Sequence, residues 1–212
     1  MEFDFDLLSP GDRTKLLLST VVPRPIAWVT TMADDGATNA APYSFFNVMG
    51  YDPPIVVVGV QSHHEKRFKD TGQNILTSAE FVVNLVSETT AVAMNITSID
   101  APPGIDELVL AGLTTAPSAK IKPPRIAESP VAFECRMHTS LTTSPNQAIV
   151  VGLVVHAHIH DAYVLDRAHC YIDTPRIGLV GRMHGSGWYT RTSDQFQMDR
   201  PIWSDRVKQG KN

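Results

Sequence analysis

The chain has 212 residues, enough for one large domain with a sizeable buried core. Its 43% hydrophobic and 19% charged residues are typical of a soluble globular protein, and a net charge of -4 without a basic stripe argues against a nucleic-acid surface. The acidic N-terminus resembles no secretory signal, and no apolar run approaches the roughly 18 residues of a membrane helix. We therefore expect a cytoplasmic protein with no membrane or nucleic-acid partner, in which Cys135 and Cys170 are free thiols.

The first residues combine a strand pattern with a helix-start signal. Phe3, Phe5 and Leu7 alternate with aspartates, which is the period-two pattern of a half-buried strand. Ser9 and Pro10 then suit an N-cap and a first helical turn. The sequence thus predicts a strand over 3–7, followed by a short helix.

Two prolines introduce the next predicted strand. Pro23 and Pro25 hold the backbone extended, so 26–31 is predicted to be a strand that ends in a hairpin turn at 33–36. Residues 43–48 fit a second strand. The later pattern predicts strands over 55–60, 80–86, 131–139 and 148–159, helices over 66–75, 89–95 and 105–111, a short strand or turn over 163–171, and a glycine-rich loop over 178–187.

Six or seven strands with few, short helices predict a mainly β protein, a β-barrel with helical insertions. The sequence has no repeat and no low-complexity linker. We expect a single domain over residues 1–200 and a polar C-terminal tail over 201–212.

Three segments suit an aromatic, phosphorylated ligand such as FMN. The strand at 22–31 offers a flat apolar wall, and the run at 39–47 is rich in Asn, Ser, Thr and aromatic residues. Backbone groups at a strand edge can read a pyrimidine, and Thr30, Asn39 and Ser44 add polar side chains. Lys69 and Thr71, near a helix start, can bind a phosphate.

In this order and spacing, the three segments resemble the flavin reductase-like family with the FMN-binding split-barrel fold, which includes flavoredoxins. The resemblance runs from about Thr20 to about Tyr189 and implies a split, Greek-key-like barrel that forms a homodimer with flavin at the interface. It implies that the strand around Trp28 lies along the isoalloxazine ring. The expected cofactor-binding residues are Arg24, Ala27, Trp28, Val29, Thr30, Asn39, Ala41, Tyr43, Ser44, Lys69 and Thr71.

A late loop departs from the family pattern. Residues 182–189 resemble an Arg-x-Gly-Gly-like loop, but His184 stands where many relatives carry glycine. That histidine could crowd the flavin or reach a substrate. It is the residue we assign to contact with nicotinamide or substrate.

The expected activity is that of an FMN-dependent NAD(P)H:flavin reductase that passes a hydride to flavin N5. A Gly-x-Gly-x-x-Gly motif after a strand is missing from the sequence, so NADH or NADPH would stack transiently against the flavin. One alternative is an FMN-binding electron carrier that serves a partner protein, such as a monooxygenase or another acceptor. Another is a flavoenzyme with its own small substrate, such as a nitro or halogenated aromatic.

A rival constellation is the stripe His156, His158 and His160. At strand spacing the three imidazoles point to one face, and three histidines form the first shell of many zinc sites. Alternate residues lie roughly 6.5–7 Å apart along a strand, which suits two ligands to one metal but strains a third. Asp161 is adjacent, but no acid stands at a motif position. The stripe therefore predicts either a zinc-binding barrel or a solvent-facing or interface surface.

Overall fold

The computed structural model of the chain describes residues 1–61, 70–101 and 105–203. The helices are α1 (Pro10–Thr20), α2 (Asp70–Ser78), α3 (Ala91–Ile96), α4 (Glu107–Leu110) and α5 (Thr174–Ile177), with a 3-10 turn η1 (Asp161–Tyr163). The strands of the main sheet are β1 (Ala27–Met32), β2 (Thr38–Tyr43), β3 (Phe46–Tyr51), β4 (Pro54–Gln61), β5 (Glu80–Leu85), β8 (Val131–Ser144) and β9 (Gln147–Ile159). Three small pairs are β6 (Thr115–Ala116) with β7 (Arg125–Ile126), β10 (Val164–Asp166) with β11 (Tyr171–Ile172), and β12 (Val180–Arg182) with β13 (Tyr189–Arg191).

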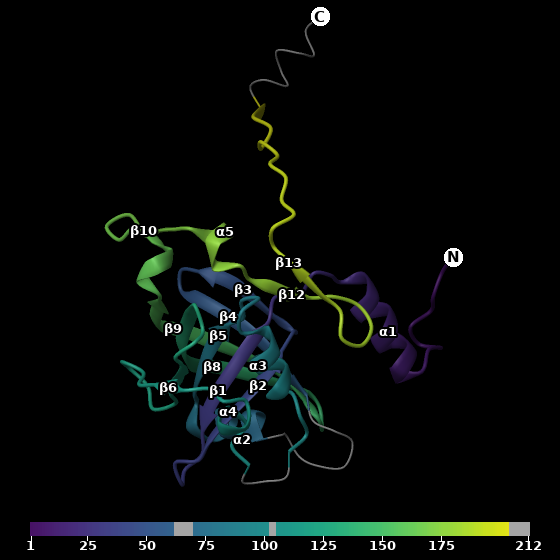
Figure 1. Cartoon of the computed structure of the whole chain (residues 1–212). Coiled ribbons are helices and arrows are strands. Elements are labelled where there is room, and N and C mark those ends of the chain that lie inside the picture. The colour runs from purple at the N-terminus through teal and green to yellow at the C-terminus, as the bar shows by residue number, and fades with distance from the viewer. Residues whose placement is uncertain (62–69, 102–104, 204–212) are drawn as a thin grey trace, which may run out of the picture.

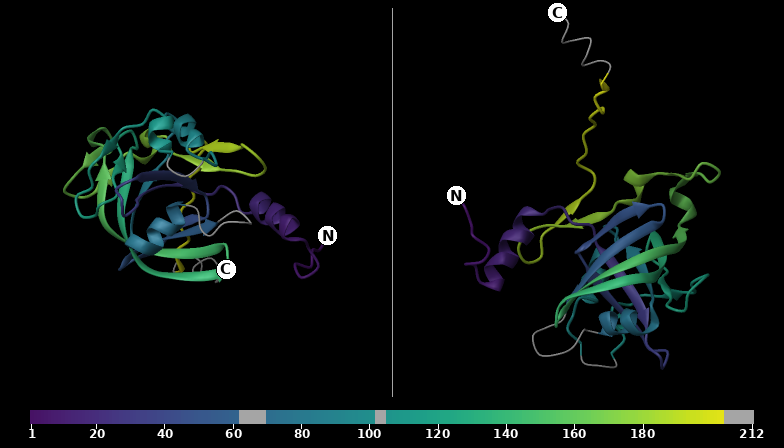
Figure 2. Two further views of the ribbon diagram at one scale, coloured as in Figure 1. Left: turned by 90° about the horizontal axis from the view of Figure 1, so that it is seen from below. Right: turned by 180° about the vertical axis from the view of Figure 1, so that it is seen from behind.

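The main sheet closes into a barrel with a seam. Its seven strands are antiparallel in the order β2-β1-β5-β8-β9-β4-β3, so β2 and β3 are its two edges. In a flat sheet of this size the edges would lie roughly 29 Å apart, whereas the two residues that join β2 to β3 span at most about 11 Å. The sheet must therefore curl until its edges approach each other, as Figures 1 and 2 show.

The inside of the barrel is filled by alternate residues of the strands. In β1, Ala27 and Val29 are fully buried there, because successive residues of a strand face opposite sides of the sheet. Residues of the other strands complete this core, among them Val56, Val58, Val60, Phe81, Val83, Cys135, Ala148 and Val150.

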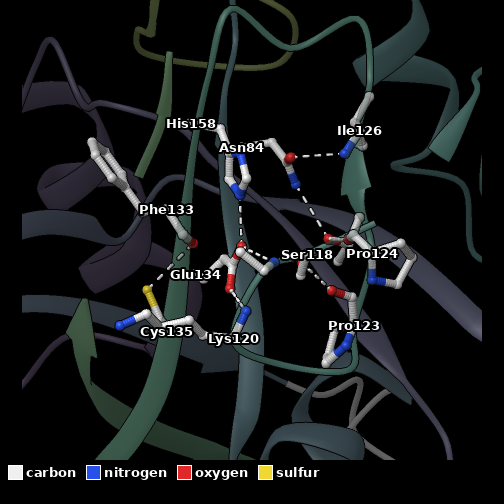
Figure 3. Close-up of polar contacts among 12 residues, drawn as sticks. Asn84, Ser118, Lys120, Pro123, Pro124, Ile126, Phe133, Glu134, Cys135 and His158 are labelled. Carbon is white, nitrogen blue, oxygen red and sulfur yellow. Dashed lines mark hydrogen bonds and ion pairs between the residues drawn. The ribbon is translucent and has the colours of Figure 1, made fainter. Parts of the chain in front are cut away.

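A second core lies outside the barrel wall, between the sheet and the helices α3 and α4. Trp28 and Ala40 face this side, where they pack with Met94, Leu108 and Ile126. Figure 3 shows how residues 117–126 are fastened to the wall by buried polar side chains. These residues thus form a cover over the outer face of β5 and β8.

Two segments project from the barrel in Figures 1 and 2. Helix α1 stands to one side, with Phe3, Phe5 and Leu17 exposed nearby. The chain after β13 runs away from the body, and Phe196 and Trp203 on it are 85% and 80% exposed. Among the described residues, no helix is long and apolar enough to cross a membrane.

The predicted fold class, a mainly β split barrel with short helices, is confirmed. The helix start at Ser9 is also confirmed, since the Ser9 hydroxyl accepts a hydrogen bond from the Asp12 N–H. The strand predicted over 3–7 is wrong: these residues form turns and are mostly exposed, without a partner strand among the described residues. The strand predicted over 43–48 is also wrong, because it runs across the break between β2 and β3.

The two cysteines are free and differ in accessibility: Cys135 is buried and Cys170 is exposed. Burial raises the pKa of Cys135 to about 12, and the nearby Glu134 carboxylate adds to this effect. Since the thiolate is the nucleophile, Cys135 is expected to stay unreactive at pH 8.

We expect Ellman's reagent to modify Cys170 rapidly in the native protein and both thiols in denaturant. Two rapidly reacting thiols in the folded protein would contradict this assignment.

Candidate functional site

The barrel seam brings together several of the polar residues that the sequence singled out. Strand β2 is an edge strand, so part of its backbone N–H and C=O groups face away from β1. Asn39, Ala41 and Tyr43 are alternate residues of β2 and lie on one face of it. Ser44 follows directly, in the short link to β3. The seam thus offers backbone and side-chain groups along one strip.

A polar cluster lies where β1 and β2 meet helix α2. The Thr71 hydroxyl donates a hydrogen bond to Asn39 Oδ1, and the Asn39 amide donates to Glu107 Oε2 at 3.0 Å. Asn74 Nδ2 donates to Thr31 Oγ1 at 3.0 Å. Thr71 and Glu107 are 1% and 8% exposed, so the cluster is held rigidly inside the fold. The structure thereby brings together Asn39 and Thr71, two of the residues expected to bind the cofactor.

Tyr43 joins this cluster from the end of β2. Burial raises the pKa of Tyr43 to about 12, a hydrogen bond with Thr71 partly offsets that rise, and the carboxylates of Glu107 and Asp70 add to it. The phenol is therefore neutral and protonated at every physiological pH. It can serve as a hydrogen-bond donor but not as a base.

Arg24 fastens three segments to one another and is only 6% exposed. Its Nη1 donates to the carbonyl oxygens of Leu18 and Val21 at 3.0 and 2.7 Å, and its Nη2 donates to that of Met183 at 2.9 Å. Its Nε donates to Ser44 Oγ at 3.4 Å. Burial, together with the positive charge of Arg182, lowers the pKa of Arg24. Four of the five donors are therefore used within the protein, which leaves little capacity for a phosphate.

His184 lies in the exposed loop between β12 and β13. Its ring stacks on that of Trp188, with 6.0 Å between the ring centroids and 13° between the planes. Arg182 shapes this loop through hydrogen bonds to the carbonyl oxygens of Gly185 and Trp188. Because Arg24 binds the Met183 carbonyl, the base of the loop is tied to Ser44 at the seam.

The β1 residues of the expected site are fully buried: Ala27, Trp28, Val29 and Thr30 have no exposed surface. Ala27 and Val29 face the barrel core, whereas Trp28 faces the outer core and its Nε1 donates to Thr97 Oγ1 at 2.8 Å. The Thr30 hydroxyl donates to the Pro124 carbonyl at 2.5 Å. Contact of this strand with a flavin stays a prediction, although the outward direction of the Trp28 side chain argues against contact through its indole ring. The role of Lys69, which lies outside the described residues, also stays a prediction.

Sequence reasoning missed Glu107 and Asn74. Glu107 accepts hydrogen bonds from the Asn39 amide and the Ala40 N–H across 67 or more residues of chain. The sequence does show a helix start at α4, where Asp106 is the N-cap and Glu107 is the first helical residue. Acidic residues at a helix start are usually exposed to solvent, so this pattern did not indicate a buried carboxylate. Only the packing of α4 on β2 reveals that the carboxylate is buried against the site.

Comparisons with known proteins show the family to which this chain belongs. The model of the flavin reductase like domain matches residues 18–173. A protein of Deinococcus radiodurans is 40% identical, over 98% of this chain and 92% of its own. The crystal structure of the 2-nitrobenzoate 2-nitroreductase NbaA of Pseudomonas fluorescens is similar with a TM-score of 0.87 and 33% identity, over 96% of this chain and 98% of that chain.

A second solved structure, nitrilotriacetate monooxygenase component B from Bacillus cereus, has a TM-score of 0.86 and 30% identity, over 93% of this chain and 98% of that chain. The resemblance inferred from the sequence is thus confirmed at the level of the family. Because the family model spans most of the chain, from before β1 to after β11, the protein belongs to the family of flavin reductase-like domains.

Proposed function

We propose that this protein is an FMN-dependent oxidoreductase, specifically an NAD(P)H:flavin reductase. The observation that carries the proposal is the position of the polar strip: the edge strand β2 with Asn39 and Tyr43, followed directly by Ser44, lies at the barrel seam, inside the segment that matches the flavin reductase-like model. The groups present fit FMN, because a strand edge can pair with the pyrimidine and the hydroxyl and amide groups suit a ribityl chain.

When bound, FMN supplies the redox chemistry, since its ring accepts a hydride from NADH or NADPH. The protein's own part is binding and positioning. Thr71 and Asn39 fix the geometry of β2 beside the ligand, and Tyr43 keeps its proton throughout. Lys69, next in the chain to helix α2, is assigned to the phosphate.

Arg24 acts as a positioning residue in this proposal. It holds Ser44 at the seam and the Met183 carbonyl at the base of the 183–188 loop. His184 at the tip of that loop is assigned to contact with nicotinamide or substrate, together with the ring of Trp188 on which it stacks. This assignment requires the loop to reach a flavin at the seam of the same or a partner subunit.

A homodimer with flavin at its interface is part of the proposal. Helix α1 and the chain after β13 project from the barrel, and they carry large apolar side chains in solvent, including Leu17, Phe196 and Trp203. Exposed apolar surface of this kind is typical of a surface that a partner covers. A second copy would bury it and would also enclose more of the ring than one barrel does.

Nitroaromatic reduction is the second candidate function. It is favoured by the similarity to the 2-nitrobenzoate 2-nitroreductase, which extends over 96% of this chain at 33% identity. The similarity to a monooxygenase component B instead supports a reductase that hands reduced flavin to a partner. In an electron carrier, FMN would stay bound and nicotinamide turnover would be negligible.

An anaerobic visible spectrum of the purified protein with FMN separates these functions. We expect NADH or NADPH to bleach the flavin band faster than it does with free FMN. A bound flavin whose absorption band is not bleached by either nucleotide would favour the carrier. A bleached band that returns when 2-nitrobenzoate is added, with consumption of the nucleotide, would favour the nitroreductase. If the protein binds no flavin, the proposed function is wrong.

Replacing Lys69 by alanine is expected to weaken FMN binding by about 1.5–3 kcal/mol, the usual contribution of a hydrogen bond to a charged group. The dissociation constant is measured by quenching of flavin fluorescence. Lys66→Ala, three residues earlier in the sequence, is the matched control and is expected to leave the constant unchanged. Equal constants for wild type and Lys69→Ala would remove Lys69 from the site.

A further inference from the structure

The histidines of β9 meet an acid that the sequence did not reveal. Glu134 of β8 lies opposite His156 in the antiparallel ladder, and the register shifts directly after it, between Glu134 and Cys135. On the other side of Glu134 the ladder is regular, with Ala132 opposite His158. The Glu134 carboxylate therefore reaches His158 as a diagonal neighbour on the same face, and its Oε1 lies 2.6 Å from His158 Nε2 (Figure 3).

We propose that Glu134, His156 and His158 form a binding site for a divalent first-row transition ion such as Zn²⁺, separate from the flavin site. One donor atom of each residue lies within 4.8 Å of the other two. Two imidazoles and one carboxylate are a ligand set that zinc and iron share, with positions left open for water.

Backbone hydrogen bonds hold the Glu134 carboxylate in a fixed orientation for metal binding. Glu134 is fully buried, yet the Ala119 N–H donates to Oε1 at 2.6 Å and the Lys120 N–H donates to Oε2 at 2.7 Å. A carboxylate has about four acceptor positions, so the two backbone bonds leave room for a metal. Such outer hydrogen bonds orient a ligand and tune its basicity. In the proposed site the ion takes the position between Glu134 and His158 that a proton now fills.

The two histidines are placed to close on an ion by a small movement. Their ring centroids are 4.8 Å apart with 62° between the planes. Donor atoms of a tetrahedral zinc site lie roughly 3.3 Å apart, so the rings need to shift by on the order of 1 Å. Neither ring is fully buried, and both can make this rotation.

An open cavity borders the proposed site at His158. The cavity has a volume of about 600 Å³ and is lined by His158, together with Arg125, His160, Asp161, Arg167 and Cys170. Water or an anion in this cavity would fill the remaining coordination positions.

His160 is excluded from the ligand set and thereby provides the control. Its Nε2 donates to the Ala127 carbonyl at 3.1 Å, and its ring stacks on Tyr163. The stripe of three histidines predicted from the sequence thus divides: two histidines gain a carboxylate from the neighbouring strand, and the third binds backbone. With only two ligands on β9, the site does not need a third histidine of the same strand, which would lie too far along the strand to reach the same ion.

The test uses the whole 212-residue chain without a tag, freed of flavin and dialysed against a chelator. Titration with Co²⁺, followed by its visible absorption, and competition with Zn²⁺ should each give one tight equivalent per chain. Mutation of a residue that only hydrogen-bonds to a metal ligand typically lowers metal affinity by about 10–100-fold. Loss of a ligand itself should lower the affinity further, so His156→Gln is expected to weaken Co²⁺ binding by at least about 100-fold. His160→Gln should bind like the wild type, and Mg²⁺ should not compete.

His156→Gln is the decisive variant because it leaves the bond between His158 and Glu134 intact, so folding, checked by circular dichroism, is expected to be retained. His158→Gln should lose the ion as well. The proposal is overturned if the wild type shows no saturable equivalent at micromolar Co²⁺. It is equally overturned if His156→Gln and His160→Gln bind alike. Since the protein is flavin-free, neither result depends on the function proposed above.

Discussion

Replacing Asn84 by alanine is expected to lower the free energy of unfolding by about 3–5 kcal/mol, because it leaves buried hydrogen-bonding groups without partners. Asn84 has no exposed surface. Its Nδ2 donates to the Trp28 carbonyl at 2.9 Å and to Thr30 Oγ1 at 3.3 Å. Its Oδ1 accepts from the Ile126 N–H at 2.9 Å (Figure 3). One side chain therefore joins β5 to β1 and to the cover over the outer face.

The Ile126 N–H decides the size of this effect. It is buried, and without the Asn84 oxygen it has no acceptor of its own, which costs about 1–3 kcal/mol for that group. Asn95→Ala on the exposed face of α3 is the control and should change the stability by no more than about 0.5 kcal/mol. Urea denaturation of both variants measures the difference. Equal stability of the two variants would mean that the outer cover contributes little to the fold.

The sequence predicts local features of this fold well and long-range ones poorly. The β-branched run at 55–60 became β4, because its side chains alternate between the barrel core and the other face. The alternation of Phe3, Phe5 and Leu7 failed as a strand signal, since a strand needs a partner and the described structure offers none there. Alternation therefore indicates a strand only where another edge is within reach.

In the candidate site too, local features could be predicted from the sequence and long-range contacts could not. The sequence assigned Asn39 and Thr71 to one site because their residue types and order match a family pattern, and the structure brings their side chains into contact; that they bind a cofactor stays a prediction. Glu107 and Glu134 were not found, because each carboxylate is buried by contacts with strands or loops far away in the chain. The partners of these carboxylates depend on strand register and on the packing of α4 against β2, and neither is written in a local motif.

Replacing Trp28 by alanine is expected to lower the free energy of unfolding by about 3–5 kcal/mol, the usual cost of removing a fully buried aromatic side chain. Trp28 has no exposed surface and packs with Met94, Leu108 and Ile126 in the outer core. Its indole N–H also donates to the Thr97 hydroxyl. Thermal or urea denaturation of the variant measures this loss.

Trp28→Phe separates the structural role of this residue from the flavin contact that the sequence predicted. Phenylalanine keeps most of the packing and loses the hydrogen bond to Thr97, so the expected cost is about 1–2 kcal/mol. Because the side chain faces the covered side of the wall, FMN affinity should stay within about twofold of the wild type, the range of a neutral substitution. A folded Trp28→Phe variant that loses most of its FMN affinity would instead mean that the indole touches the ring. The outer core would then have to open when the cofactor binds.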